Sequence, residues 1–235
     1  MATLLGEWGF LDNLNDTSGN ARHGTASGSL TYVTGPQTNT KGVKFGSTTS
    51  SVSFGRTGLE PSLEGITVMA WVRLEGTPGL DIVLHAMSKA RASNSSRSRI
   101  GIAYTASGAV RRRAAVARWK DALDVSDAGA SWTDTGWHHV AIVDGNTRFA
   151  YYTDGTQEAS TARALGATAN TAWEDFPWCT GLNLTYPSDP VTSTNFSVSG
   201  IRIFQGELTT GEINTWMNTA IVAAAANTGR MFFAA

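Results

Sequence analysis

Cysteine is almost absent from this sequence of 235 residues, in which Cys179 is the single example. One cysteine excludes an intrachain disulfide and a thiolate metal cluster. Because Trp178 precedes it and a strand-like apolar run follows, we expect Cys179 to be a small buried hydrophobic residue and not a nucleophile. Disulfide-linked scaffolds and thiolate zinc modules are therefore excluded.

Long apolar runs and an excess of one charge are missing as well. The longest apolar run, residues 220–226, is far shorter than the roughly 20 residues that a membrane-spanning helix needs. Residues 1–8 lack a basic region followed by a long apolar one, so we expect no secretory signal and a soluble protein made in a cytoplasm. A net charge of −1 gives no overall attraction to nucleic acid or to an anionic membrane. We therefore expect no nucleic-acid partner and no membrane insertion.

Short runs that alternate in period two fill most of the chain, which has 25 glycines and 41% hydrophobic residues. In the run 66–74, every second side chain is apolar and falls on one face. Similar runs, rich in Val, Ile and aromatic residues, occur at 3–10, 43–45, 51–54, 82–87, 99–104, 137–143, 149–153, 179–184 and 197–204. Asp144-Gly145 and Asp154-Gly155 favour the positive φ of tight hairpin turns. The pattern predicts an all-β protein, an antiparallel two-sheet sandwich.

One amphipathic helix is predicted near the C-terminus. Thr209 and Glu212 have the spacing of a capping box, and apolar residues then recur at helical spacing. These apolar residues are Ile213, Trp216, Met217, Ala220 and Ile221. Such a stripe is typical of a helix packed on the core. Because Asn227-Thr228-Gly229 stops the pattern, we expect one domain, residues 1–226, that includes this helix.

The last residues, 227–235, form an apolar tail. Met231, Phe232 and Phe233 are large and apolar, and burying each would contribute roughly 1.5–3 kcal/mol. We therefore expect the tail to dock onto a neighbouring subunit or back onto the sandwich.

Ordered motifs along the chain carry a resemblance to a known family. They are Trp8-Gly9-Phe10-Leu11-Asp12, Asp16-Thr17-Ser18-Gly19-Asn20, His23-Gly24-Thr25, Gly42-Val43-Lys44-Phe45-Gly46, Ile66-Thr67-Val68-Met69-Ala70-Trp71-Val72, Gly136-Trp137-His138-His139-Val140-Ala141, Tyr152-Thr153-Asp154-Gly155, Ile201-Arg202-Ile203-Phe204 and Leu208-Thr209-Thr210-Gly211-Glu212-Ile213. From about Leu4 to Met217, the sequence resembles the LamG-like, concanavalin A-like jelly-roll family of lectin and glycan-binding modules. The resemblance implies two facing antiparallel sheets, one of them concave, and a role in binding or adhesion.

Enzymatic activity is not expected. Some relatives with this sandwich hydrolyse glycans with a Glu-x-Asp-x-x-Glu strand motif, which places carboxylates on one face, and this chain lacks it. Glu174 and Asp175 are adjacent, so in a strand they would point to opposite faces. The same geometry separates His138 from His139, so the two histidines cannot comfortably share one metal ion. We expect both to be packed or hydrogen-bonded strand residues.

Calcium is the cofactor that the resemblance raises. Asp16 matches the family's N-terminal loop, where a carboxylate and backbone carbonyls supply hard oxygen ligands. Relatives often carry Asp-Glu before the last core strand, whereas this chain has Ser199-Gly200. We favour the alternative that Asp16 and Asn20 shape an Asx-type turn, and we expect no cofactor.

A basic segment between Lys89 and Lys120 contains no acidic residue, yet it holds half of the 18 Lys and Arg residues. An extended Arg111-Arg112-Arg113 sends arginine to both faces, whereas a sandwich strand has one face on the core. Because an unpaired buried guanidinium is costly, these arginines need acidic partners or exposure on both faces. The partners available are Asp121, Asp124 and Asp127, or an acidic subunit or an anionic glycan. The alternative is a solvated face on two strands joined at Ser107-Gly108.

Candidate contacts for a ligand or partner combine this basic segment with aromatic and amide side chains. They are Arg111, Arg112, Arg113, Arg118, Trp119, Trp132, Trp173 and Asn183. Two functions fit these candidate contacts. One is recognition of a cell-surface glycan, and the other is assembly as a structural subunit, with other subunits or with copies of the same chain. A bacteriophage virion component, minor tail or capsid-decorating, satisfies both, because a chain without a signal sequence reaches the outside by lysis. The alternative is a glycan-binding module excised from a secreted bacterial protein, which would be extracellular.

Overall fold

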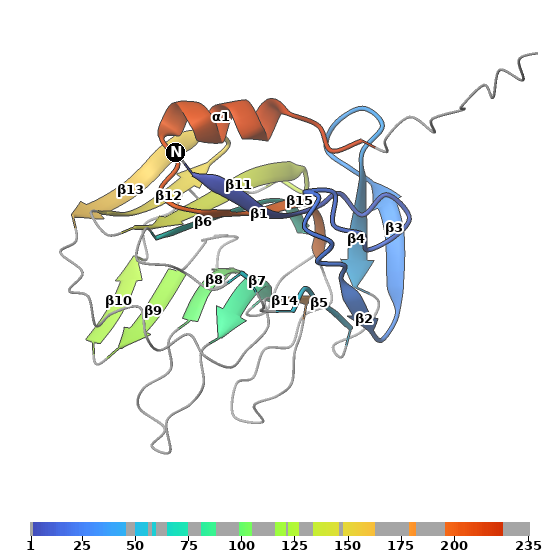
Figure 1. Ribbon diagram of the computed structural model, residues 1–235, viewed down its shortest axis with the longest axis horizontal. Helices are drawn as coiled ribbons and strands as arrows, with labels where there is room; N and C mark the ends of the chain where they lie inside the picture. Colours follow the sequence, from blue (N-terminus) through green and yellow to red (C-terminus); the bar gives the residue numbers. More distant parts are fainter. Residues whose placement is uncertain are drawn as a thin grey trace, which may run out of the picture.

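The computed structural model describes residues 2–45, 50–55, 58–59, 65–74, 81–87, 99–104, 116–120, 122–126, 134–145, 148–162, 179–181 and 196–222 (Figure 1). Two main antiparallel sheets face each other, and helix α1 (Thr210–Asn218) lies across the outer side of the larger one. The predicted all-β, antiparallel fold with a short C-terminal helix is confirmed.

The larger sheet has 8 strands. Its order is β13 (Thr156–Ala162), β12 (Arg148–Thr153), β11 (Trp137–Asp144), β6 (Ile66–Leu74), β15 (Phe196–Gln205), β4 (Lys41–Phe45) and β3 (Leu30–Thr34), and β1 (Thr3–Trp8) also pairs with β15. Both Asp-Gly turns join antiparallel neighbours, β11 to β12 and β12 to β13. At the second turn, Asp154 and Gly155 have φ of 48° and 77°, the positive values that this dipeptide favours.

The smaller sheet has 5 strands. Its order is β2 (Thr25–Ser27), β5 (Ser51–Ser53), β14 (Cys179–Gly181), β7 (Asp81–Met87) and β8 (Arg99–Tyr104). A separate two-stranded pair consists of β9 (Val116–Lys120) and β10 (Ala122–Ser126).

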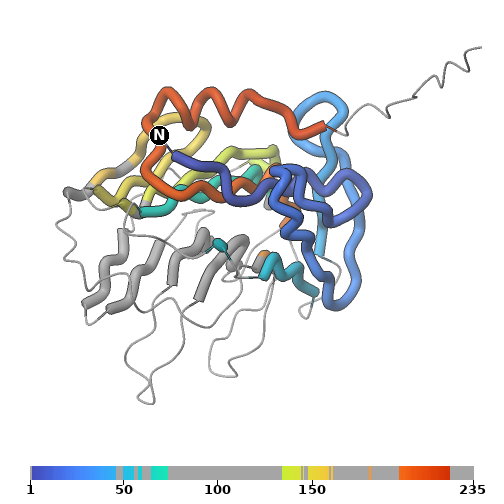
Figure 2. The backbone as a smooth tube through the Cα atoms, viewed as in Figure 1, coloured from blue at the N-terminus to red at the C-terminus, as the bar shows by residue number. Residues whose placement is uncertain are grey.

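Strand β15 has three partners. It pairs with β6 on one side, and on the other side with β4 near Val198 and then with β1 from Ile201 onward. Figure 2 shows β1 and β15, which are far apart in the sequence, lying side by side. The change of partner falls at a bulge between Ser199 and Arg202, where Gly200 has φ of 56°. Glycine adopts this conformation without strain, so Ser199-Gly200 has a backbone role here.

Alternation along β6 separates two hydrophobic clusters, one on each side of the larger sheet. Val68 and Val72 belong to the cluster that also contains Val52 and Phe54 from the region of the smaller sheet. Met69 belongs to the cluster under α1, which buries Ile213 completely. The helix therefore covers an apolar outer face that would otherwise meet water.

Helix α1 begins as predicted but ends earlier. Thr209 and Glu212 form the predicted capping box, whereas the helix stops at Asn218, and Thr219 is extended with φ of −90° and ψ of 105°. The prediction that the helical pattern continues through Ala220 and Ile221 is therefore wrong. Among the described residues, no helix is long and apolar enough to cross a membrane.

Candidate functional site

The structure positions two of the predicted contact residues, Arg118 and Trp119, which are neighbours on β9. In the β9–β10 pair, Arg118 stands opposite Asp124, one of its predicted acidic partners, and Trp119 stands opposite Leu123. The remaining predicted contacts, Arg111, Arg112, Arg113, Trp132, Trp173 and Asn183, and the tail residues Met231, Phe232 and Phe233, lie outside the described residues.

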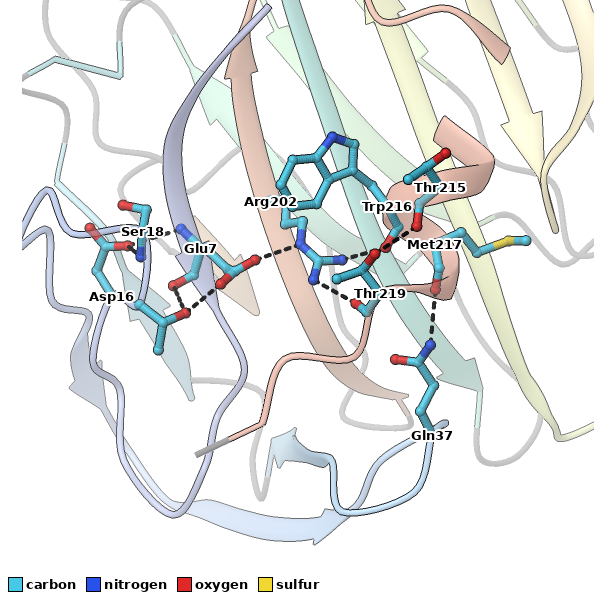
Figure 3. A network of polar contacts seen from close by, with 10 residues as sticks. Glu7, Asp16, Ser18, Gln37, Arg202, Thr215, Trp216, Met217 and Thr219 are labelled. Atoms are coloured by element: carbon cyan, nitrogen blue, oxygen red, sulfur yellow. Dashed lines mark hydrogen bonds and ion pairs between the residues drawn. The ribbon is translucent and has the colours of Figure 1, made fainter. Parts of the chain in front are cut away.

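Asp16, the calcium candidate, is buried in a loop beside β1. Its Oδ1 accepts the amides of Glu7 at 3.0 Å and Ser18 at 2.9 Å, and its Oδ2 accepts the amide of Arg22 at 2.9 Å. The Ser18 contact is an Asx turn. Figure 3 shows Asp16 between Ser18 and Glu7. The carboxylate therefore ties the loop to β1 through backbone donors.

Electrostatics favour the ionised form of Asp16. Burial alone would raise its pKa, but the hydrogen bonds from Ser18, Arg22 and Glu7 outweigh burial and hold the pKa below its usual range. The carboxylate of Glu7, the nearest acidic group of this network, accepts from Thr17 and Arg202. These donors already satisfy the carboxylates, and the described residues contain no group of three His, Cys, Asp or Glu that could hold a metal ion. This donor set does not fit a calcium ion.

His138 and His139 lie on opposite faces of β11, as expected for adjacent strand residues. His138 is half-buried, with Nδ1 2.7 Å from Oδ2 of Asp154 and Nε2 3.0 Å from Oδ1 of Asp134. His139 is fully buried, packs edge-on against Trp71 at 5.2 Å between ring centroids, and neither of its ring nitrogens has a hydrogen-bond partner. One histidine is hydrogen-bonded and the other is packed.

The environment of His139 requires a neutral ring. Burial, with a smaller contribution from the positive charge of Arg202, lowers the pKa of His139 to about 3. A neutral, enclosed imidazole without polar partners is not placed for proton transfer to a bound substrate.

Arg202 is a buried arginine on the outer face of the larger sheet, and the sequence analysis did not identify it. Arg202 is 2% exposed, and its Nε donates to Oε2 of Glu7 at 2.7 Å. Its two terminal nitrogens donate to the carbonyls of Trp216 and Thr219, each at 2.7 Å, at the end of α1 (Figure 3). The guanidinium also lies 5.2 Å from the centre of the Trp216 ring. Arg202 therefore links the end of α1 to β15 and β1 and supplies donors to carbonyls at the helix terminus.

An aromatic and cationic pair lies on the same outer face. The guanidinium of Arg73 lies 5.0 Å from the centre of the Trp137 ring, and both residues are half-buried. A side chain at Gly42 would come within 2.8 Å of the Trp137 ring, so the glycine allows the ring to lie close to the sheet. Tryptophan rings and guanidinium donors are groups that contact saccharides.

Two facing antiparallel sheets, with a helix packed on the outer side of the larger one, define a lectin-like β-sandwich. A family model supports this class directly: the Laminin_G_3 model, described as the concanavalin A-like lectin/glucanases superfamily, matches residues 45–214. The chain belongs to this family.

Solved structures show the same fold over nearly the whole chain. Domain 4 of AbnA, a GH43 extracellular arabinanase from Geobacillus stearothermophilus, in complex with arabinotriose, is similar with a TM-score of 0.68 and 17% identity over 92% of this chain and 98% of that one. The binding domain of Paraclostridial mosquitocidal protein 1 has a TM-score of 0.65 and 15% identity over 92% of this chain and 52% of that one. Trypanosoma rangeli sialidase in complex with sialic acid has a TM-score of 0.63 and 17% identity over 90% of this chain and 32% of that one.

The chain thus spans about half of the mosquitocidal binding domain and about a third of the sialidase. A search of curated proteins gave no match.

Proposed function

We propose that this protein is a non-enzymatic recognition module that binds a saccharide. One observation carries the proposal: the chain matches 98% of an arabinanase domain whose structure is a complex with arabinotriose. The similarity therefore covers a whole saccharide-bound domain and not a fragment of one. The outer-face pair Arg73 and Trp137 adds groups suited to saccharide contact.

Three acidic residues of the described part have partners within the fold, which supports recognition without cleavage. Glycoside hydrolysis needs two carboxyl groups that face one bond. Asp16 binds backbone amides, Glu7 pairs with Arg202, and Glu212 caps α1. Each of these carboxylates stabilises the fold.

We further propose that the module is a surface component of a phage virion, in the minor tail or decorating the capsid. In that setting the basic segment and the apolar tail both have partners. The arginines would face an anionic glycan or a neighbouring subunit, and Met231, Phe232 and Phe233 would dock onto a subunit. The alternative is a glycan-binding module of a secreted bacterial protein.

Electrophoresis through gels that contain an anionic polysaccharide tests the basic segment. The double substitution Arg111→Ser and Arg113→Ser should reduce retardation and flatten its dependence on salt. A matched control, Lys41→Ser with Lys44→Ser, removes the same charge from β4 and should change retardation little. Equal retardation and equal salt slopes for the parent and the arginine variant, with both folded, would contradict a contact role for these arginines.

Immunogold labelling tests the virion setting. An antibody against the chain should label the tails or capsids of particles whose genome encodes it. Unlabelled particles, with the chain detected in the same lysate, would favour the secreted module.

A further inference from the structure

His138 lies in a continuous chain of hydrogen bonds at the start of β11. The amide of Gly136 donates to Oδ1 of Asp134 at 2.7 Å, and the same oxygen lies 3.0 Å from Nε2 of His138. On the other side of the ring, Nδ1 lies 2.7 Å from Oδ2 of Asp154, whose Oδ1 accepts the amide of His139 at 2.8 Å. Three segments meet at this ring: the turn before β11, β11 itself and the β12–β13 turn.

The two distances fit a doubly protonated ring. A neutral imidazole has one N–H and one lone pair, so one carboxylate would face a lone pair at hydrogen-bonding distance. An imidazolium donates from both nitrogens and forms charge-assisted bonds to both carboxylates. Within the part of the chain that the structure describes, the charged groups placed against the ring are Asp134, from the preceding turn, and Asp154, from the β12–β13 turn. On the neighbouring strand β6, the residue opposite His138 is the uncharged Val72.

His138 and its two carboxylate partners all reach the surface. Its side chain is 16% exposed, whereas those of Asp134 and Asp154 are 61% and 46% exposed. Histidine is the side chain whose charge ordinarily changes between about pH 5 and 8.

The β12–β13 turn also contacts the helix. A side chain at Gly155 would come within 1.8 Å of Oδ1 of Asn214 on α1. His138 therefore supports, from the sheet side, a turn that α1 covers on the other side.

We infer that His138 is a proton-dependent brace: its protonated ring holds the turn before β11 and the β12–β13 turn together, and loss of one proton releases one of the two. At low pH, the protonated ring therefore holds both turns at this end of the larger sheet, and at high pH one of these two contacts is lost. The inference does not depend on saccharide binding, and it assigns a physical role to one member of the His-His pair.

Nitrogen NMR of the parent protein tests the brace directly. At about pH 5.5, both ring nitrogens of His138 should show the shifts of protonated nitrogens, and one should change on raising the pH to about 8.5. A single protonated nitrogen at the lower pH would overturn the inference.

Melting temperatures give a second test. The loss of melting temperature caused by His138→Gln should be larger at about pH 5.5 than at about pH 8.5, by about 2–4 °C. Both proteins contain His139, so its titration cancels in the comparison. The matched control is His23→Gln: Nδ1 of His23 accepts the amide of Asp16 at 3.2 Å, so protonation of that ring brings no gain. Equal losses at the two pH values would overturn the brace, and if His138→Gln does not fold, the NMR measurement decides.

Discussion

Arg202 shows how a single residue shapes the outer face of the larger sheet. A charged side chain in the middle of an apolar strand ordinarily points to solvent, yet Arg202 is buried and donates to acceptors on Glu7, Trp216 and Thr219. Burial lowers the pKa of Arg202, while the hydrogen bond and charge of Glu7 act in the opposite direction. The sequence analysis did not identify a role for Arg202, because the carbonyls that accept its hydrogen bonds lie at the end of α1 and no local pattern around Arg202 locates them.

We predict that Arg202→Met lowers the free energy of unfolding by about 3–5 kcal/mol, because the partly buried Glu7 carboxylate and the Thr219 carbonyl lose the Arg202 donor, and the Trp216 carbonyl keeps only the Thr219 amide. Denaturant titration measures the change. The control is Lys41→Met, whose ion pair with Asp12 has a 3.6 Å separation and side chains 45% and 65% exposed. That exposed pair should contribute less than about 1 kcal/mol. Similar losses for the two variants would contradict the role of Arg202.

His139 should make the protein less stable in acid. Its pKa is about 3 in the folded chain against an ordinary 6.5, so below pH 6.5 the unfolded chain binds a proton that the folded chain rejects. Stability should fall as the pH drops from about 6.5 toward 3, by at most about 1.4 kcal/mol per pH unit, and His139 contributes no dependence above 6.5.

The variant His139→Met isolates this effect. Its stability should depend less on pH between about 6.5 and 5, above the range in which Asp16, Asp134 and Glu212, whose pKa values are lowered, take up protons. Denaturant titrations at several pH values measure both curves. Parallel curves for parent and variant would show that His139 does not titrate as its burial requires.

The hydrogen bonds of Asp16 lead to a prediction about metal removal. Backbone amides already bind both of its oxygens, so a chelator should leave the melting temperature nearly unchanged. Calorimetric scans with and without chelator measure this. A large drop reversed by added calcium would show a metal site, because a ligand of the folded state raises stability with its concentration.

At the scale of elements, strands with an apolar alternation were predictable and polar strands were not. The runs that became β6, β11, β12 and β15 alternate between two buried faces or lie in the core. Strands β2 and β13 consist largely of exposed polar residues, so their sequences resemble loops, and β3, β9 and β10 were missed as well. Their pairing with a neighbouring strand, and not their own hydrophobic pattern, defines them.

Helix α1 has one end that the sequence predicted correctly and one that it did not. Its beginning depends on local chemistry: the Thr209 hydroxyl accepts the Glu212 amide at 3.3 Å, and the Glu212 carboxylate accepts the Thr209 amide at 2.8 Å. At its end, the carbonyls of Trp216 and Thr219 accept from Arg202 on β15, a contact outside the helix itself; the start was predicted correctly and the end was not.

We predict that Thr209→Ala lowers the free energy of unfolding by about 1 kcal/mol, since it removes the N-cap acceptor. Thr215→Ala is the control, because Thr215 is exposed within the helix and alanine has the higher helix propensity. Thermal unfolding should show a loss for the first variant and little or no loss for the second. Equal effects would mean that the cap does not stabilise α1.

At the scale of the whole molecule, the order of motifs predicted the family, and the family model and the fold confirm it. The candidate contact residues were harder to test, because most lie outside the described residues. For Arg118 the structure gives only the backbone register, in which it stands opposite Asp124. Saccharide recognition depends on side chains that loops bring together, and such groups do not follow the periodicity of strands.

The central claim is that this sandwich recognises a saccharide without cleaving it. A glycan array that includes arabino-oligosaccharides, sialylated glycans and bacterial polysaccharides, probed with the intact chain and followed by mass spectrometry of each retained saccharide, tests it most directly. We predict that at least one class is retained and recovered at its original mass. An array without binding, or recovery of shortened products, would contradict the account.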